Sequence, residues 1–306
     1  MKSIGIVLVD WNGEEVTIPC LEHLVVIETG DLFTFRIVVV DNGSDVPIAP
    51  TVNSRFPDVV VLRSPSNLGF AGGNNIGIRY LLQQNVDLIL LLNNDTIAEK
   101  EFLLQLFRYI DDKPSVAAVQ PRINFLHDRN MIWNAGTIFN PLLGTTLTRG
   151  YGASDKGQFS KPEKMPWLTG CCMLIRASVL KDPDVGLLNE RYQTYYEDAY
   201  WSMRARKKGY ELHYVPTARI FHIAGFSVNR KGDPKEGPKD PLVVRLHTRN
   251  RIWFMRTCTP FLFKPFAYPY HILYILSMAA FYVLRGRKKK LSMVGKAFRE
   301  GFFQTP

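Results

Sequence analysis

Four side chains of this sequence have the type and placement that chemistry requires: Asp95, Glu197, Asp198 and His222. The first ends the triplet Asn93-Asn94-Asp95, which directly follows five consecutive apolar residues at 88–92. Such a run is typical of a buried strand in a parallel sheet, and these sheets bind ligands at the carboxyl ends of their strands. A carboxylate there suits a hard divalent cation that holds a diphosphate. The same residues would also form a turn and an N-cap before a helix over 100–111.

Glu197 and Asp198 open an expected helix at 199–207, directly after two tyrosines. Acids at a helix start are favoured by the helix dipole, so a simple capping role is one reading. A general base also requires a carboxylate in a partly apolar cleft, and the residues leave both roles open. His222 ends an expected strand, where a histidine is usually structural. If Asp95 holds a metal, imidazole is a usual further ligand for a transition metal such as Mn²⁺.

The elements that must position these side chains alternate along the first half of the chain. Apolar, β-branched runs predict five strands, at 4–9, 35–40, 59–62, 88–92 and 116–119. Segments with helical spacing lie between them, so we expect an α/β fold with a mostly parallel sheet flanked by helices. Polar clusters follow three of the strands, at 10–13, 41–45 and 93–95, and should therefore lie along one edge of the sheet.

Two common nucleotide motifs are absent from the sequence. No G-x-G-x-x-G follows the first strand and no G-x-x-x-x-G-K-[ST] occurs, which disfavours a dehydrogenase and a P-loop protein. A glycine-rich segment at 67–77 predicts a loop before a helix that ends near residue 84. It would either let the backbone approach a ligand or act as a connector capped by Asn74 or Asn75.

The second half of the chain is less regular. Residues 122–166 predict irregular structure and a hairpin with a short strand at 145–149. A buried strand is expected at 167–176, with Gly170 as a point of close approach. Two further short strands are expected at 211–215 and 218–222, before a charged loop at 229–240.

Charge and hydropathy set the last fifth of the chain apart. Residues 241–306 contain 12 of the 38 Lys and Arg residues and one of the 28 acidic residues, which gives this segment a net charge of +11. Because the whole chain has a net charge of +10, residues 1–240 have a net charge of −1. Helices are expected at 242–256 and 291–303. The uncharged stretch 266–284 has about the minimum length of a membrane span, but Pro269 and its tyrosines favour an interfacial segment. Basic residues at 285–290 would match anionic lipid headgroups, so we expect a peripheral membrane anchor, with a span as the alternative, and no nucleic acid.

The four cysteines contain no C-x-x-C pair, so neither a disulfide framework nor a zinc site is expected. This fits a reducing compartment. No secretory signal is recognised at the start of the sequence, and a cytoplasmic location is expected.

Taken in order, six motifs resemble the inverting glycosyltransferases of family 2, and among them the bacterial rhamnosyltransferase-like group. They are Asp41-Asn42-Gly43-Ser44, Asn67-x-Gly-Phe-Ala-Gly-Gly-Asn-Asn-x-Gly77, Leu92-Asn93-Asn94-Asp95-Thr96, Gly170-x-x-Met173-Leu174-Ile175-Arg176, Glu197-Asp198 and His222-x-x-Gly225-x-Ser227. The resemblance covers about residues 4–227 and implies a GT-A fold. Residues 1–120 would form the nucleotide-binding half and 121–240 the acceptor-binding half. Residues 241–306 would be a helical, membrane-associating extension.

The resemblance also implies roles for individual residues. Asp198 falls on the catalytic base, and Asp95 falls on the last position of a D-x-D motif for Mg²⁺ or Mn²⁺. His222 falls near the metal and the diphosphate. Because Asn93 replaces the first acid of that motif, we expect weaker metal binding. Contacts to the nucleotide sugar, with Asp41 at the base, are implied for Asp10, Asn12, Asp41, Asn67, Gly72, Asn75, Asn93 and Asn94.

On the acceptor side, Trp167 would stack on a sugar or pack in the core, near Gly170. Glu197 would position or cap rather than act as the base. The triplet Arg249-Asn250-Arg251 recurs in the resembled group, and it would touch a phosphate or belong to a solvated basic face.

The implied activity is inverting, metal-dependent transfer from a nucleotide diphosphate sugar. The resembled group favours rhamnose from dTDP-rhamnose, with galactofuranose, glucose or N-acetylhexosamine as alternatives. The acceptor would be a saccharide or a polyprenyl-diphosphate-linked sugar in bacterial cell-surface polysaccharide synthesis, at the inner face of the plasma membrane. A non-catalytic, membrane-associated protein that binds sugar nucleotides on the same scaffold is the other hypothesis.

Overall fold

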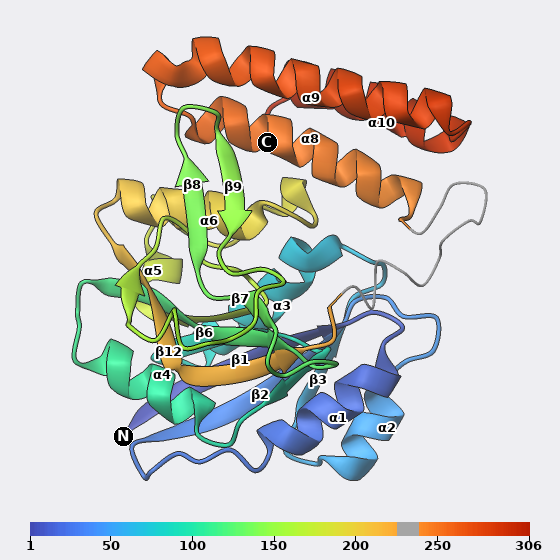
Figure 1. Cartoon of the computed structure of the whole chain (residues 1–306). Coiled ribbons are helices and arrows are strands. Elements are labelled where there is room, and N and C mark those ends of the chain that lie inside the picture. The colour runs from blue at the N-terminus through green and yellow to red at the C-terminus, as the bar shows by residue number, and fades with distance from the viewer. Residues whose placement is uncertain (225–238) are drawn as a thin grey trace.

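A mixed sheet with helices on both faces forms the body of the protein, and a layer of helices covers one end (Figure 1). The computed structural model describes residues 1–224 and 239–306. Within these, the sheet contains β1 (Lys2–Asp10), β2 (Phe33–Asp41), β3 (Val60–Arg63), β4 (Leu88–Asn93), β5 (Thr96–Ala98), β6 (Val116–Phe125), β7 (Ile132–Asn134), β10 (Glu163–Lys164), β11 (Cys172–Arg176) and β12 (Glu211–His222). The strand order is β10-β12-β6-β11-β4-β1-β2-β3, with β5 beside β12 and β7 beside β6.

Parallel pairing dominates the centre of the sheet, as the sequence predicted. β1 pairs in parallel with both β4 and β2, β2 pairs in parallel with β3, and β12 pairs in parallel with β6. β11 runs antiparallel between β4 and β6. Asp10 is paired with Asp41, and Val9 with Asn93. The polar residues that follow β1, β2 and β4 therefore lie at one edge of the sheet.

Each face of the sheet has its own apolar core. The helices are α1 (Glu14–Leu24), α2 (Ala49–Arg55), α3 (Gly69–Gln83), α4 (Phe102–Asp111), α5 (Ala177–Lys181) and α6 (Glu197–Lys207), with a 3₁₀ turn η1 (Glu190–Tyr192). One core joins the sheet to α1, α2 and α4, and the other joins it to α3, α5 and α6. This arrangement follows from strands that are apolar on both sides.

Three local expectations were wrong. Of the strand expected at 167–176, only Cys172–Arg176 is a strand, β11. The glycine-rich segment forms the first turns of α3 rather than a loop. Its glycines allow the helix to lie close to β1. A Cβ added at Gly73 would lie 2.7 Å from the Val9 side chain, and one added at Gly77 would lie 2.6 Å from the Val7 side chain. The segments 211–215 and 218–222 form the single strand β12, with an irregularity after Val215 where a proline cannot donate to the ladder.

The C-terminal helices form a layer that a hairpin connects to the sheet (Figure 1). The hairpin is β8 (Thr137–Asn140) with β9 (Thr145–Thr148), as expected near residue 145. The layer contains α8 (Pro241–Cys258), the 3₁₀ turn η2 (Phe261–Phe263), α9 (Lys264–Leu284) and α10 (Lys288–Phe303). Gly225 and Ser227 of the last motif, and all but the end of the expected 229–240 loop, lie outside the described residues.

Candidate active site

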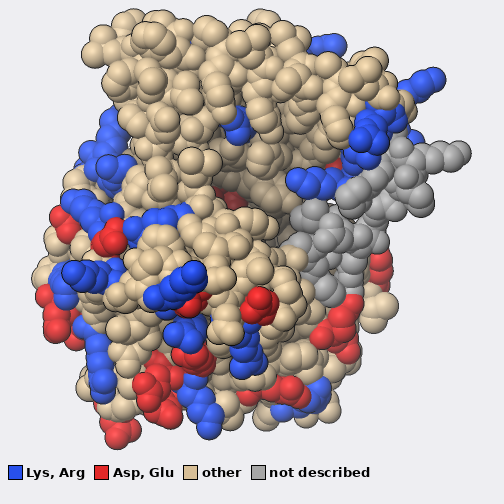
Figure 2. Space-filling view, in the orientation of Figure 1, with Lys and Arg blue, Asp and Glu red and all other residues tan. Residues whose placement is uncertain are grey.

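A cavity of about 600 Å³ lies between the polar edge of the sheet and the C-terminal helices. In Figure 2 it is the hollow below the helical layer. Nine of the residues singled out from the sequence line it: Asn67, Asn93, Asn94, Asp95, Trp167, Gly170, Glu197, Asp198 and His222. Asp95 and Asp198, which are 103 positions apart in the sequence, thus share one cavity.

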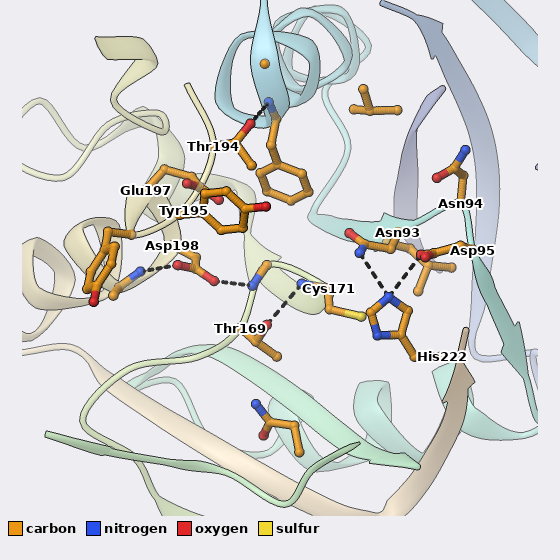
Figure 3. A pocket seen from close by; sticks show the side chains of 18 of the residues that line it. Asn93, Asn94, Asp95, Thr169, Cys171, Thr194, Tyr195, Glu197, Asp198 and His222 are labelled. Carbon is orange, nitrogen blue, oxygen red and sulfur yellow. Dashed lines mark hydrogen bonds and ion pairs between the residues drawn. The ribbon is translucent and has the colours of Figure 1, made fainter. Parts of the chain in front are cut away.

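Asp95 and His222 form one corner of the cavity (Figure 3). His222 Nε2 lies 3.0 Å from Asp95 Oδ1 and 3.4 Å from Asn93 Nδ2, and both the histidine and the aspartate are buried. The edge of the Trp133 ring lies against the imidazole, with centroids 4.5 Å apart. Burial opposes the imidazolium, but Cys171 and the Asp95 carboxylate outweigh burial and raise the pKa of His222 to about 10.

This corner fits a divalent cation that the substrate helps to bind. Among the described residues, no group of three or more His, Cys, Asp or Glu could hold a metal by itself. The Asp95 carboxylate, the amide oxygen of Asn93 and the imidazole of His222, which must give up its proton to the metal, leave coordination positions for phosphate oxygens and water. Mg²⁺ and Mn²⁺ at phosphate-transferring sites are held in this way, by few protein ligands and the substrate itself.

Asp198 and Glu197 lie across the cavity from this corner, at the start of α6 (Figure 3). Both oxygens of Asp198 accept a backbone hydrogen bond, Oδ2 from Gly170 N–H at 2.9 Å and Oδ1 from Ala199 N–H at 2.7 Å. A Cβ at Gly170 would lie 2.9 Å from the Phe70 ring and 3.5 Å from Asp198, so this position requires glycine. The expected close approach at Gly170 is therefore present.

The surroundings of the two carboxyl groups favour the ionised form of Asp198 more than that of Glu197. Burial and, second, the charge of Asp198 raise the pKa of Glu197 well above its ordinary value. Burial also raises the pKa of Asp198, but N–H groups from Gly170 and Ala199 oppose that rise by stabilising the carboxylate. Glu197 Oε2 is buried without a hydrogen-bond partner among the described residues. The arrangement therefore keeps Glu197 protonated and gives the negative charge of the pair to Asp198.

A strained loop leads into these two acids. Gln193, Tyr195 and Tyr196 have φ angles of 61°, 74° and 70°, in a region that costs residues other than glycine about 1–3 kcal/mol each. The Asn250 amide donates to the carbonyls of Tyr192, Thr194 and Tyr195 at 2.7, 2.8 and 2.8 Å. Helix α8 thus holds the loop in its strained form.

Arg249 also holds this strained loop, and together with Asn250 it forms what we call the clamp. Arg249 does not line the cavity. Its Nη2 donates to the carbonyls of Arg191 and Tyr192 at 2.9 and 3.2 Å, and its Nε donates to Asn250 Oδ1 at 2.9 Å. The guanidinium also lies 4.3 Å from the ring centroid of Trp253. The side chain is 7% exposed, so a solvated basic face is the wrong reading of this arginine.

Replacing Asn250 by Ala should slow any reaction in which Asp198 takes part by about 10–100-fold, while ligand binding at the Asp95–His222 corner changes little. The variant leaves strained carbonyls unpaired and lets Asp198 move, and small displacements of a reacting group are costly. Steady-state kinetics checks this, with the exposed Asn130→Ala as the matched control. An unchanged kcat in a folded Asn250→Ala protein would show that the clamp does not position Asp198.

Five of the residues singled out for the nucleotide lie behind the cavity wall and do not line it: Asp10, Asn12, Asp41, Gly72 and Asn75. Asp10 accepts from Thr17 Oγ1 at 2.7 Å, and Asp41 pairs with Arg63 at 2.7 Å. The side-chain amide of Asn75 donates to the carbonyl of Leu188 at 2.8 Å. In this structure these groups fix the loops that form the wall.

The cavity also contains residues that sequence reasoning missed. They include Trp133, Thr146, Tyr195, Tyr196 and His247. The two tyrosines were visible as the unexplained aromatic pair before Glu197. Nothing in the sequence alone placed His247 and Arg251, on α8, over the edge of the sheet.

The sequence matches a known protein family and resembles several named transferases. The model of glycosyl transferase family 2 matches residues 6–182. The low-salt glycan biosynthesis hexosyltransferase Agl10 of Haloferax volcanii is 28% identical over 215 residues, which cover 69% of this chain and 64% of that protein. The N-acetylglucosaminyl-diphospho-decaprenol L-rhamnosyltransferase of Mycobacterium tuberculosis is 26% identical over 211 residues, 63% of this chain and 68% of that protein.

The fold also matches a solved glycosyltransferase. The mannosyltransferase PcManGT from Pyrobaculum calidifontis, in complex with GDP-Man and Mn²⁺, has a TM-score of 0.54 and 12% identity, covering 98% of this chain and 87% of that one. The family model covers more than half of this chain and contains Asp95, although it ends before Asp198 and His222. The chain belongs to glycosyl transferase family 2.

Proposed function

We propose that the protein is an inverting glycosyltransferase that uses Asp198 as its base and Asp95 with His222 at the diphosphate of a nucleotide sugar. The observation that carries the proposal is the shared cavity, with the carboxyl group of Asp198 on one side and the Asp95–His222 corner on the other (Figure 3). The relatives' names include hexosyl and rhamnosyl transfer. We therefore take rhamnose from dTDP-rhamnose as the first donor to test.

The mechanism is a single displacement. Asp198 removes the proton of an acceptor hydroxyl, and that oxygen attacks the anomeric carbon on the face opposite the diphosphate. The bond to the diphosphate breaks as the new bond forms, so the configuration inverts. Gly170 N–H and Ala199 N–H hold the carboxylate of Asp198 in place. Asp95, His222 and Asn93 would hold Mg²⁺ or Mn²⁺, which stabilises negative charge on the departing diphosphate when bound.

The acceptor would enter between the sheet and the C-terminal helices. Trp167 is 8% exposed, lines the cavity and packs against Ala199 and Phe254, so it combines packing with a surface for a sugar. The decaprenol-linked substrate in one relative's name supports a lipid-linked acceptor.

A panel of nucleotide sugars with Mn²⁺ or Mg²⁺ tests the proposal. We expect the right donor to raise the melting temperature only with the cation, and to be hydrolysed slowly when no acceptor is present. Binding without any hydrolysis or transfer would favour the non-catalytic alternative. A panel in which no nucleotide sugar shifts the melting temperature would contradict the proposal.

The C-terminal layer would bring the enzyme to a membrane surface. The described chain has one helix, Phe261–Leu284, that is long and apolar enough to cross a membrane. α9 packs against α8 and α10, while exposed apolar side chains remain: Phe261, Leu262, Phe266, Leu273, Leu276 and Leu284. Figure 2 shows few charges over this layer compared with the body. The exposed basic residues Arg285 and Lys288 follow this apolar surface directly, so we infer a peripheral, cytoplasmic-face association with anionic lipid rather than a span.

Washing membranes that contain the protein should separate these cases. We expect high salt to release part of the protein and alkaline carbonate to release the rest, because the contact combines charge with shallow apolar insertion. Retention after carbonate would indicate a span instead. Complete recovery in the soluble fraction at low salt would contradict both.

A further inference from the structure

Arg251 differs from the other arginines of α8 in what it contacts. Arg245 pairs with Glu300 at 2.6 Å, and Arg256 donates to the carbonyls of Gly301 and Gln304. Arg249 caps the strained loop, as described above. These three hold the layer together. Arg251 lines the cavity, and no carboxylate of the described residues lies within ion-pair distance of it.

The Arg251 guanidinium is held in a fixed orientation. Its Nε donates to His271 Nδ1 at 3.1 Å, and Nε2 of the same ring lies 2.9 Å from the carbonyl oxygen of Leu143. A carbonyl can only accept, so Nε2 carries the proton and Nδ1 is free to accept from the arginine. The guanidinium also lies 4.2 Å from the ring centroid of Tyr274 and 5.8 Å from that of Tyr270.

Among the described residues, the groups around Arg251 do not neutralise its charge. Burial first, and then the charge of Arg251, lower the pKa values of His247 and His271 to about 4, so both rings are neutral at physiological pH. The remaining neighbours are tyrosines. Within the described lining of the cavity, Arg251 is the one Lys or Arg, whereas Asp95, Glu197 and Asp198 are acids. A fixed guanidinium in an aromatic setting is a good receptor for a phosphate, which it can bind through two N–H groups.

The position of Arg251 indicates which phosphate it would meet. Its partners Tyr270, His271 and Tyr274 belong to α9, whereas the Asp95–His222 corner belongs to the sheet. On the same helix, Leu273 and Leu276 are 66% and 60% exposed. One helix thus presents aromatic rings to the arginine and an apolar surface to the outside. An arginine beside an exposed apolar helix face suits a ligand that has a phosphate group joined to a hydrocarbon chain.

We propose that Arg251 binds the phosphate of a prenyl-linked saccharide acceptor, and that the prenyl chain leaves the cavity along α9. The proposal rests on the proposed transferase function and adds the residue that recognises the acceptor's phosphate and the path of its chain. In this arrangement the phosphate lies on the α9 side of Asp198, and the sugar beyond it reaches the carboxylate.

Direct binding measurements test the proposal. Isothermal titration with farnesyl diphosphate, with farnesol, and with UDP or dTDP plus Mn²⁺ would compare wild type with Arg251→Gln, Arg251→Lys and Arg299→Gln. Arg299 is an exposed arginine of α10 outside the cavity, so its variant removes the same charge without the site. We expect Arg251→Gln to weaken farnesyl diphosphate binding by about 10–100-fold, the usual effect of losing a charged hydrogen-bond pair. Arg251→Lys should lose less, and Arg299→Gln should match wild type.

Nucleotide and farnesol binding should be the same in all four proteins. Equal weakening of nucleotide binding in Arg251→Gln would assign the arginine to the donor phosphates and overturn the proposal. Unchanged farnesyl diphosphate binding in that variant, or an equal loss in Arg299→Gln, would overturn it too. If Arg251→Gln does not fold, the charge-retaining Arg251→Lys still distinguishes these outcomes. Wild-type protein that binds no nucleotide would count against the transferase function, separately from the acceptor result.

Discussion

Replacing Asp198 by Asn should lower transfer by about 10²–10⁴-fold, the usual contribution of a general base, while the affinity for the nucleotide sugar persists. The amide oxygen can still accept from one of the two N–H groups that bind Asp198, at Gly170 or Ala199, but the amide cannot take a proton from the acceptor. Steady-state kinetics and donor titration check the two parts separately. Retained turnover in this variant would remove Asp198 from the mechanism.

Glu197→Gln is the matched control for this result. Because burial and Asp198 keep Glu197 protonated, glutamine resembles the form that is present, and most activity should remain. The pH profile gives an independent readout. Burial raises the pKa of Asp198, and the base must be deprotonated to act, so activity should fall on acidification at a pH above the ordinary aspartate value of about 3.9. A larger loss in Glu197→Gln than in Asp198→Asn would exchange the two roles.

Replacing Asp95 by Asn should lower kcat/KM by about 10²-fold or more and shift half-maximal activity to higher Mn²⁺ concentration. The change removes the carboxylate of the Asp95–His222 corner, and a loss of about 3 kcal/mol of charge stabilisation corresponds to this factor. Metal titrations of activity measure it.

The opposite substitution, Asn93→Asp, supplies the comparison. Asn93 lies at the same corner, 3.4 Å from His222, so a carboxylate there adds a second negative ligand. Half-maximal activity should then require about tenfold less Mn²⁺, in keeping with the effect of ligand charge on affinity. Unchanged metal dependence in both variants would show that the cation, if used, binds elsewhere.

The sequence by itself determined the sheet and the edge at which chemistry can occur. The apolar runs of β1, β2 and β4 must be buried on both faces, and each ends in polar residues, so Asp10, Asp41 and Asn93 could be placed together without coordinates. The hairpin near residue 145 and the C-terminal helices were readable for similar local reasons. The helix that begins at Gly69 was missed because its glycines serve tight packing against β1, a contact that local propensity does not encode.

Tertiary structure alone decided which of the candidate residues meet. Asp198 faces the cavity because the strained loop before it is held by Asn250, about fifty residues later in the chain, and no local pattern reveals such a partner. Arg249 was expected to touch a phosphate or solvent, but its contacts hold the strained loop instead. The same helix, α8, brings Arg251 to the cavity. The spacing of apolar residues along the chain predicts individual helices and strands. It does not predict the contacts of α8, because these depend on how the C-terminal helices pack against the sheet. That packing is set by burial summed over many residues.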